Sequence, residues 1–565
     1  MARPIRRSPF PLLLYLTVIF FWHIGHAEII NVPADFPLIQ TALNASQNGD
    51  TVLMQPGTYR ESLYIPGHDV TLAGRFLLTG DTNDVALCVL GPPAETNNVR
   101  CIYALESGTT TMLRMIGLTI NGEVYATTQQ RGGLDITNRS LIVHRCVFDS
   151  CSAVRGGAVA MNGGAAVFTN TRLSHCGSNW RGTVLELIGA TTTLEHCALD
   201  HDFATEITSS TAIYSESADL ILDGCAIHEI GMTGFPGRTF LSLPDDSCAA
   251  KLSNCDIVNN RFHHFFGDVG QSCRITFDSN FVSHNEFFHD LLVSTMLGSG
   301  TVALIRGNTF LENTNLNSAA YAGRMFFTLA GANLRIEITG NLFLRNFNRE
   351  NSVLTMGDDA YSLFTVRGNY IIENSQDAIA NPPGGTMMLI DNQAGYIQYN
   401  IIRDNQGYAA FNGFNAFPPG YAQNNWWGNA TGPYDSAGNP AGQGDTVEWH
   451  ITYTPWEGDT SFMDTTESVR TATLPTDFVI GYAYPNPFNS QVTIEFAITR
   501  QLSIRLEVFD LLGRRVETLT VGEYKIGIHR VVWQADGHSS GIYFARLTSA
   551  ASSQPPEFYK LILLK

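Results

Sequence analysis

The chain of 565 residues carries a formal net charge of −18, is 44% hydrophobic and contains 51 glycines. This length allows two or more domains or one long repeat array. An acidic chain repels phosphates, which argues against nucleic acid as a partner, and no apolar run beyond the N-terminus is long enough for the mature chain to span a membrane. Acidic loops could hold Ca²⁺, although solvation alone more often explains them, and no other cofactor is indicated.

Residues 1–27 form a predicted signal peptide. Three arginines lie within the first seven residues, residues 10–24 are apolar, and small residues end the segment. This pattern predicts export and cleavage between Ala27 and Glu28. The alternative, an uncleaved membrane anchor, is disfavoured because the apolar run is short for a membrane span.

A short helix is predicted next, with Asp35 as its candidate N-cap. The apolar residues that follow share one helical face, which could cover the edge of the first β-strands. These residues are Leu38, Ile39, Ala42 and Leu43. Strands are predicted after the helix at residues 51–54, 62–65 and 70–72.

A repeated phrase then dominates the chain: Asn, an apolar residue two places on, and a second Asn three places further. It fits six times with Asn at its first position and once with Cys, at intervals of 24 to 33 residues. Looser copies begin at positions 146, 170, 197 and 225. The first positions of the seven fits are Cys255, Asn280, Asn308, Asn341, Asn369, Asn400 and Asn424.

The local pattern within each repeat decides between repeat architectures. Apolar residues alternate with others over four to six places, as in VALIRGNTF and LRIEITGNLF, which predicts strands rather than helices. The variable interval fits an open solenoid better than a closed propeller, because an insertion only lengthens one surface loop. Residues 28–456 are therefore predicted to form a parallel β-helix that is capped at its N-terminus by the helix.

In such a solenoid, equivalent residues of neighbouring coils lie about 4.8 Å apart. An Asn at the same bend of every coil can hydrogen-bond the Asn above and below it, which satisfies amides that would otherwise be buried unpaired. Asn also tolerates the left-handed backbone of a tight bend. The phrase is thus predicted to be a structural ladder, and the apolar residue in it is predicted to point into the core.

All ten cysteines lie between positions 88 and 273. An even number of cysteines in an exported chain permits disulfides, and the repeat phase predicts two bridges, Cys248–Cys273 and Cys151–Cys176. Cys197, Cys225 and Cys255 share the ladder position itself. Their stacked Cβ atoms would be about 4.8 Å apart, wider than the ~3.8 Å usual in a disulfide, which favours buried thiols there.

After residue 456 the repeat stops. Residues 457–478 are polar, Thr-rich and aperiodic, which predicts a linker. Residues 479–565 contain alternating strands at 491–496, 503–510, 529–534 and 541–547, which predicts a small antiparallel immunoglobulin-like β-sandwich. The fold class is therefore all-β.

Two parts of the chain resemble known protein families. The phrase IQTALNASQNGDTVLMQPGTYRE and the closing NNWWGN…GP resemble right-handed parallel β-helix proteins of the pectin lyase-like superfamily. Residues 479–565 resemble the type A sorting domain of the type IX secretion system, through YPNPFN, VFDLLGRRV, GIHRVVW, SGIYFARL and KLILLK. The matching residues include Tyr484, Pro485, Asn486, Pro487, Phe488, Asn489, Gly513, Trp533, Gly541 and Tyr543.

The second resemblance implies the type IX secretion machinery as a partner. It also implies that the protein is secreted or held at the outer surface of a Gram-negative-type bacterium. The first resemblance implies polysaccharide as a candidate ligand, and it implies fold more strongly than activity.

The sequence offers few candidate catalytic or metal-binding residues. The catalytic motifs of polygalacturonase-like, pectin methylesterase-like and pectate lyase-like enzymes are missing, and only the pairs Asp245–Asp246 and Asp358–Asp359 and the acidic stretch at 199–206 stand out. Solvated turns explain these acids more simply. A candidate Zn²⁺ site, for which exposed loop histidines are the alternative, comprises His263, His264, His284, Glu286 and His289.

Two functions stay open at this stage. The favoured one is a non-catalytic structural, adhesive or glycan-binding module. The alternative is a polysaccharide lyase or glycoside hydrolase whose active site the sequence does not reveal.

Overall fold

The computed structural model describes residues 27–565 with the exception of a set of short segments. These are residues 94–100, 106–110, 123–131, 201–210, 232–238, 291–297, 317–332, 350–353, 358–362, 377–384, 391–394, 414–419, 449–450, 465–477, 485, 487, 499–500, 512, 525–526, 553–555 and 564–565. Within the described residues, no helix combines the length and the apolar character needed to cross a membrane.

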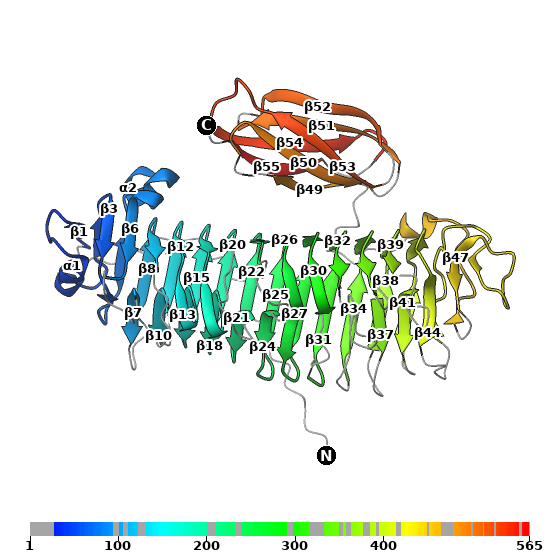
Figure 1. The fold of residues 1–565 in the computed structure, drawn as a ribbon, viewed down its shortest axis with the longest axis horizontal. Helices are drawn as coiled ribbons and strands as arrows, with labels where there is room; N and C mark the ends of the chain where they lie inside the picture. The colour runs from blue at the N-terminus through cyan, green and yellow to red at the C-terminus, as the bar shows by residue number, and fades with distance from the viewer. Residues whose placement is uncertain are drawn as a thin grey trace, which may run out of the picture.

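Three long parallel sheets wind around one core and form the β-solenoid seen in Figure 1. Sheet A has sixteen strands, from β1 (Ile29–Val32) to β48 (Ile451–Thr452). Sheet B has thirteen, from β3 (Gly57–Arg60) to β43 (Ile401–Arg403), and sheet C has twelve, from β4 (Leu63–Tyr64) to β40 (Ser375–Gln376). The parallel β-helix predicted from the repeat is confirmed.

One coil illustrates the geometry of the others. β28 (Arg274–Asp278) lies in sheet A, β29 (Phe281–Ser283) in sheet B and β30 (Glu286–Asp290) in sheet C. Alternate side chains point into the solenoid and are fully or almost fully buried there, as the period of two requires. At the two bends of this coil, one residue each adopts a left-handed backbone: Ser279 (φ 56°) and His284 (φ 54°).

The residue after each bend builds the asparagine ladders. Asn280 donates from its main-chain N–H to Oδ1 of Asn308 at 2.8 Å, and its side-chain Nδ2 donates to the same oxygen at 3.0 Å. The same pair of bonds recurs from coil to coil, so each carboxamide accepts from the previous coil and donates to the next. The first ladder comprises Asn280, Asn308, Asn341, Asn369, Asn400 and Asn425.

The end of this ladder corrects the sequence prediction. Asn425, not Asn424, accepts from Asn400, at 2.9 Å. Asn424 instead occupies the left-handed position, with φ 56°, and the buried tryptophan of the last coil is Trp427. The left-handed residue therefore always precedes the ladder residue, and a second Asn at that position shifted the predicted register by one.

A second ladder runs along the bend between sheets B and C. Asn313, for example, donates from Nδ2 to Oδ1 of Asn346 at 3.0 Å. This ladder ends on a carboxylate, because Asn405 donates to Oδ2 of Asp445 from both its main-chain N–H and its Nδ2. Its asparagines are Asn260, Asn285, Asn313, Asn346, Asn374 and Asn405.

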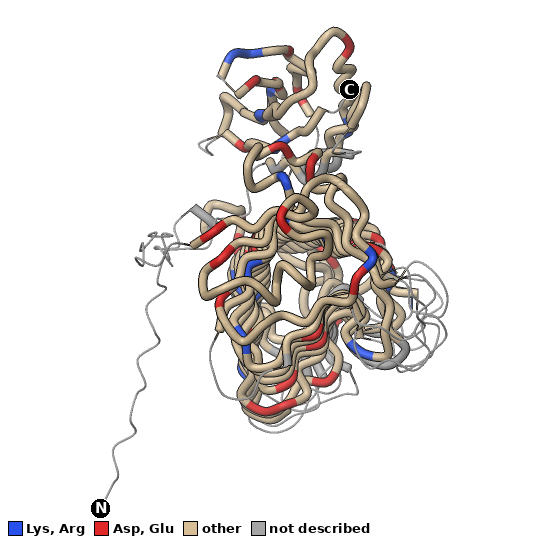
Figure 2. Tube along the Cα trace, turned by 90° about the vertical axis from the view of Figure 1, so that its left-hand side faces the viewer, with Lys and Arg blue, Asp and Glu red and all other residues tan. Residues whose placement is uncertain are grey.

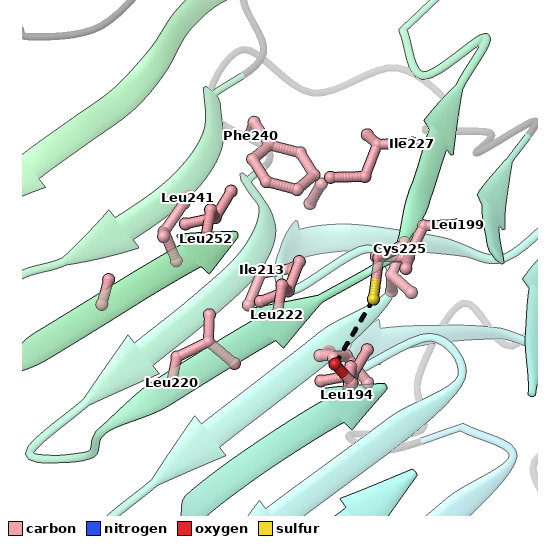
Figure 3. Close-up of a cluster of buried hydrophobic side chains, with 14 of the residues drawn as sticks. Leu194, Leu199, Ile213, Leu220, Leu222, Cys225, Ile227, Phe240, Leu241 and Leu252 are labelled. Carbon is pink, nitrogen blue, oxygen red and sulfur yellow. Dashed lines mark hydrogen bonds between the residues drawn. The ribbon is translucent and has the colours of Figure 1, made fainter. Parts of the chain in front are cut away.

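Towards the N-terminus, cysteines take over these stacked positions. Figure 3 shows Cys225 within a cluster of buried side chains, and its thiol donates to the carbonyl of Leu194 at 3.4 Å. All ten cysteines are buried free thiols. Cys197, Cys225 and Cys255 are unbonded here, in agreement with the expectation for the ladder position.

The two predicted disulfides are not formed. Cys248 and Cys273 directly precede the paired residues Ala249 and Arg274 on adjacent coils, and Cys151 and Cys176 are related in the same way. The phase prediction thus placed them correctly as neighbours. Parallel stacking at about 4.8 Å nevertheless holds their Cβ atoms further apart than a disulfide requires.

The N-terminal helix α1 (Ile39–Ala45) buries Ile39, Ala42 and Leu43 as predicted. Leu38, predicted to share that face, is the N-cap residue and is half exposed, and Asp35 does not cap the helix. Asp35 instead accepts from the main-chain N–H of Asn31 at 2.7 Å. The helix N-terminus is satisfied from a distant part of the chain, because Glu61 accepts the N–H groups of Ile39 and Gln40 at 2.9 and 3.0 Å. A helix N-terminus favours a carboxylate, whichever element supplies it.

The C-terminal domain is a sandwich of two antiparallel sheets, drawn in orange and red beside the solenoid in Figure 1. Its strands enclose a separate core that includes Trp533. One sheet contains β49 (Phe478–Tyr484), β50 (Gln491–Ile498) and β53 (Gly527–Gln534). The other contains β52 (Arg515–Tyr524), β51 (Leu502–Asp510), β54 (Gly541–Ser549) and β55 (Glu557–Leu563).

Candidate functional site

The histidine-rich segments do not assemble into one site. His263 and His264 lie on β27 (Arg261–Val269) with ring centroids 4.5 Å apart, whereas His284 lies at a bend and pairs with Glu312 at 3.1 Å. Glu286 instead faces Arg261 at 3.2 Å, and the side chain of His289 lies outside the described residues. Among the side chains that are described, no three His, Cys, Asp or Glu residues are grouped as a metal site would require.

The acidic pairs singled out in the sequence have turn roles where they are described. Asp245 accepts the hydroxyl of Ser217, and Asp246 accepts the N–H of Gln271 at 2.7 Å. Asp358 and Asp359 lie outside the described residues, as does the stretch 201–206. Asp200, just before that stretch, forms an ion pair with Arg172 at 2.9 Å.

Sheet C carries two carboxylates that the sequence analysis missed. Asp135 on β10 (Leu134–Thr137) and Glu186 on β18 (Leu185–Ile188) both align with Ala160 of the intervening strand β14 (Val159–Asn162). Their neighbours along the strands point into the core, so these two residues point outward, yet both are 0% exposed. Two strand spacings, about 9.6 Å, separate their Cα atoms.

The surroundings of these carboxylates are aromatic and basic. Arg155 on β13 (Ser152–Arg155) approaches Glu186 to 4.0 Å, and the same row of sheet C continues to Tyr103 on one side and Tyr214 on the other. A signal was present in the sequence: each acid occupies the outward place of an alternating strand, in LDIT and LELI. The acids singled out in the sequence are close to each other in the chain, whereas stacking places these two distant acids on alternate strands of one sheet.

The outer face of sheet A is the second candidate surface, and most of its outward residues are partly or fully exposed, with Leu304 a buried exception. Its central row runs in register through Thr193, Ile221, Lys251, Thr276, Leu304, Glu337 and Thr365. Seen along the solenoid in Figure 2, the backbones of successive coils superpose, so residues at one register position lie one behind another.

Charge is distributed unevenly along this face. From β25 (Ala249–Ser253) to β38 (Leu363–Arg367), each of five successive strands presents one cation outward. The two preceding strands, β19 (Thr191–Glu195) and β22 (Leu220–Asp223), present acids instead, at Glu195 and Asp223. The five cations are Lys251, Arg274, Arg306, Arg335 and Arg367.

Some of these cations are held by neighbours. Arg306 contacts Glu337 at 2.9 Å, and Arg335 contacts the other oxygen of the same carboxylate. The guanidinium of Arg367 lies 4.8 Å from the centre of the Tyr399 ring. These contacts fix the heads of the long side chains on the surface of the sheet.

The sorting motif joins the start of the C-terminal domain to its last strand. Asn486 donates to the carbonyl of Lys560 and accepts from the N–H of Ile562, both at 2.8 Å. Phe488 is buried beside Trp533, whose indole N–H donates to Glu517 at 3.0 Å. Tyr543 donates its hydroxyl to the carbonyl of Ser539 at 2.8 Å, and Gly513 adopts φ 74° in a turn. Of the remaining motif residues, Asn489 is exposed and Gly541 begins β54. The side chain of Tyr484 is not described, and Pro485 and Pro487 lie outside the described residues.

Comparison with known proteins identifies this domain. Residues 482–559 match the family described as the secretion system C-terminal sorting domain. The chain thus carries a type IX sorting domain behind a parallel β-solenoid, and this domain marks it as a secreted or cell-surface protein. A comparison with curated proteins found no match.

Solved structures similar to the chain include phage tailspike proteins. A tailspike of the E. coli bacteriophage HK620 is 11% identical, with 87% of this chain and 88% of that chain covered and a TM-score of 0.32. Tailspike gp49 of the Acinetobacter baumannii bacteriophage Fri1, a capsular polysaccharide depolymerase, is 11% identical, with 96% and 78% covered and a TM-score of 0.25. At these values the likeness carries no information on activity.

Proposed function

We propose that this protein is an exported, non-catalytic module that binds polysaccharide along the outer face of sheet A. The sorting domain accounts for delivery to the cell exterior, and the solenoid accounts for the shape of the binding surface. The observation that carries the proposal is the continuity of sheet A, whose sixteen strands form one parallel sheet with an outward row in register.

A face of this kind suits an extended polymer better than a small molecule. Small-molecule sites are concave and bury most of their ligand, whereas sheet A offers a long row of side chains at one register position. Three of its seven members, Thr193, Thr276 and Thr365, are short and polar. Because the asparagine ladders fix the coils, such a face is pre-organised, and binding need not order it. Each sugar of an extended chain can then meet an equivalent position of the next coil.

The test is binding and cleavage measured on the same sample. The mature chain, residues 28–565, is run in native gels that contain one of a panel of neutral and charged polysaccharides, and the same mixtures are assayed for new reducing ends and unsaturated products. The proposal expects retarded migration with at least one polysaccharide and no product. Unchanged migration with every polysaccharide would overturn it.

The buried carboxylates of sheet C favour a second candidate, a glycoside hydrolase. Inverting hydrolases hold two carboxyl groups about 6.5–9.5 Å apart, a range that side chains on alternate strands can reach. The row also supplies tyrosines that could stack on sugar rings. This candidate comes second because both carboxylates are 0% exposed, so substrate could reach them only after a rearrangement.

One pair of variants distinguishes the two candidate functions. Asp135→Asn and Glu186→Gln should leave polysaccharide binding unchanged if sheet A is the site. If the mature chain releases reducing ends and either variant abolishes that release, the hydrolase is the correct function.

A further inference from the structure

The ligand class follows from the charges of sheet A, an inference that rests on the proposed function. We infer that the polysaccharide is anionic and lies along the five coils that carry Lys251, Arg274, Arg306, Arg335 and Arg367. Each of these coils contributes one cation to the outer face, and neighbouring coils rise by about 4.8 Å. The cations lie at the start, the centre or the end of their strands, so their charges are spread over the width of the sheet. A polymer that carries several acidic groups can meet them.

The net charge of this surface is positive, whereas the net charge of the whole chain is negative. The protein carries 34 Lys and Arg against 52 Asp and Glu, and acidic positions are prominent around the solenoid in Figure 2. On the described outward positions of the five strands the balance is reversed, with five cations against Asp278 and Glu337. A positive stretch in an acidic protein attracts an anionic ligand while the remaining surface repels it, which sets where the ligand binds.

The two acids do not cancel this stretch. Glu337 is shared between Arg306 and Arg335, so one carboxylate is opposed by two guanidinium groups. Asp278 aligns with Arg306 of the next coil and with Ser253 of the previous one. Arginine supplies four of the five cations, and its planar fork is suited to carboxylate and sulfate groups.

The outward charges of sheet A change from acidic to basic between β22 and β25, and this change marks one end of the site. Glu195 and Asp223 lie on the two strands before Lys251, and they would repel an anionic polymer from that half of the face. The site therefore begins at β25 and extends towards β38. A polymer that binds there spans about 20 Å of the solenoid, four strand spacings.

The experiment uses a pair of polymers that differ in charge alone. Carboxymethyl-dextran and unmodified dextran of the same length are titrated into the mature chain, residues 28–565, at low and at high salt. Carboxymethyl-dextran should bind at least about tenfold more tightly than dextran at low salt, and high salt should remove most of the difference, because exposed charges are screened.

Matched charge variants locate the site. Lys251→Gln combined with Arg274→Gln should weaken carboxymethyl-dextran binding by about tenfold, whereas Arg172→Gln, which removes a cation from sheet B, should leave it unchanged. Thermal melting of each variant verifies that the fold is retained. A Glu195→Gln variant, which removes an acid, should bind at least as tightly as the parent chain and shows whether the assay responds to charge.

The outcomes separate the two proposals. Equal binding of dextran and its carboxymethyl form, or equal losses in the sheet A and sheet B variants, overturns the anionic ligand while polysaccharide binding stands. If neither these polymers nor any polysaccharide of the panel binds, both proposals fail. Binding of a single-stranded DNA of equal charge as tightly as carboxymethyl-dextran also overturns the inference, because the surface would then recognise charge without sugar.

Discussion

Asn308 donates from Nδ2 to Oδ1 of Asn341 at 2.9 Å, although 33 residues separate the two in the chain. The main-chain N–H of Asn308 donates to the same oxygen, also at 2.9 Å. Both side chains are buried, so neither could be satisfied by water if its partner were removed. This one relationship, repeated along two bends, fixes the register of every coil that it joins.

Replacing Asn341 should therefore destabilise the solenoid severely. Asn341→Ala removes the acceptor of two buried donors on Asn308 and also removes the bonds from Asn341 Nδ2 to Asn369 and to the carbonyl of Ile305. Each buried group left unpaired costs about 1–3 kcal/mol, so a loss of at least about 3 kcal/mol is expected. The melting temperature of the mature chain measures it. Thr193→Ala on the outer face is the control, with an expected change within about 0.5 kcal/mol. Equal effects of the two substitutions would contradict a ladder role.

Asp445→Asn should stabilise the protein at neutral pH. Asp445 ends the second ladder as a carboxylate, and burial raises its pKa to about 6. Because this folded pKa lies above the ordinary value of 3.8, the stability that protonation supplies is complete below about pH 4 and is lost as the pH rises through 6. The neutral amide avoids this loss, so the variant should gain about 1–3 kcal/mol at pH 7 and much less at pH 4.

Melting of Asp445→Asn and of the parent chain between pH 4 and pH 8 tests this sign. A gain that does not depend on pH would mean that the ionisation of Asp445 is not involved. A loss at pH 7 would mean that the amide cannot continue the ladder.

Gly368 isolates the cost of the left-handed bend. It adopts φ 67°, and an added Cβ would meet no atom closer than 3.9 Å, so a side chain has room. Gly368→Ala should cost about 1–2 kcal/mol from backbone strain alone, and Gly368→Asn should cost less because Asn tolerates this conformation better. Gly458→Ala, at an open position without a left-handed backbone, should be neutral. If alanine at 368 were as well tolerated as at 458, the strain argument would be wrong.

The ten cysteines should react as thiols only after unfolding. All are buried, and burial raises the pKa of Cys101 and of Cys146 to about 12, so neither ionises near neutral pH. The thiolate is the reactive form, so a thiol reagent should label almost none of them in the native chain and all ten in denaturant. An intact mass 4 Da below that of the reduced chain would instead show two disulfides.

The fold could be predicted because the repeat encodes it twice. The alternation of apolar residues gave the strands, and the Asn phrase gave the interval at which coils stack. The error at Asn424 has a local cause. The bend needs a left-handed residue directly before the ladder residue, and Asn suits both positions, so two adjacent asparagines left the register ambiguous by one residue. The copy at Asn170 was misplaced by one residue in the same direction, because Asn170 is the left-handed residue, with φ 51°, and Thr171 occupies the ladder position, where its hydroxyl accepts from the N–H of Cys146 at 3.4 Å.

The candidate sites were harder to predict, because they depend on which coils are neighbours. Asp135 and Glu186 are 51 positions apart in the chain and come within two strands of each other only through Ala160. The predicted histidine site was wrong for a different reason. These residues follow successive ladder positions, which suggested that they approach each other, but the bend at His284 directs that residue towards Glu312 on the next coil. The group of five cations on sheet A is likewise visible only once the order of its strands is known.

The central claim, a continuous stack of coils that presents one outer row, can be tested with a single distance. Spin labels on cysteines introduced at Thr193 and Thr365, two outward positions six strand steps apart in sheet A, should be about 29 Å apart with a narrow distribution. The buried native thiols should not react with the label in the folded chain. A broad distribution, or a distance far from that value, would contradict the stack and with it the binding face.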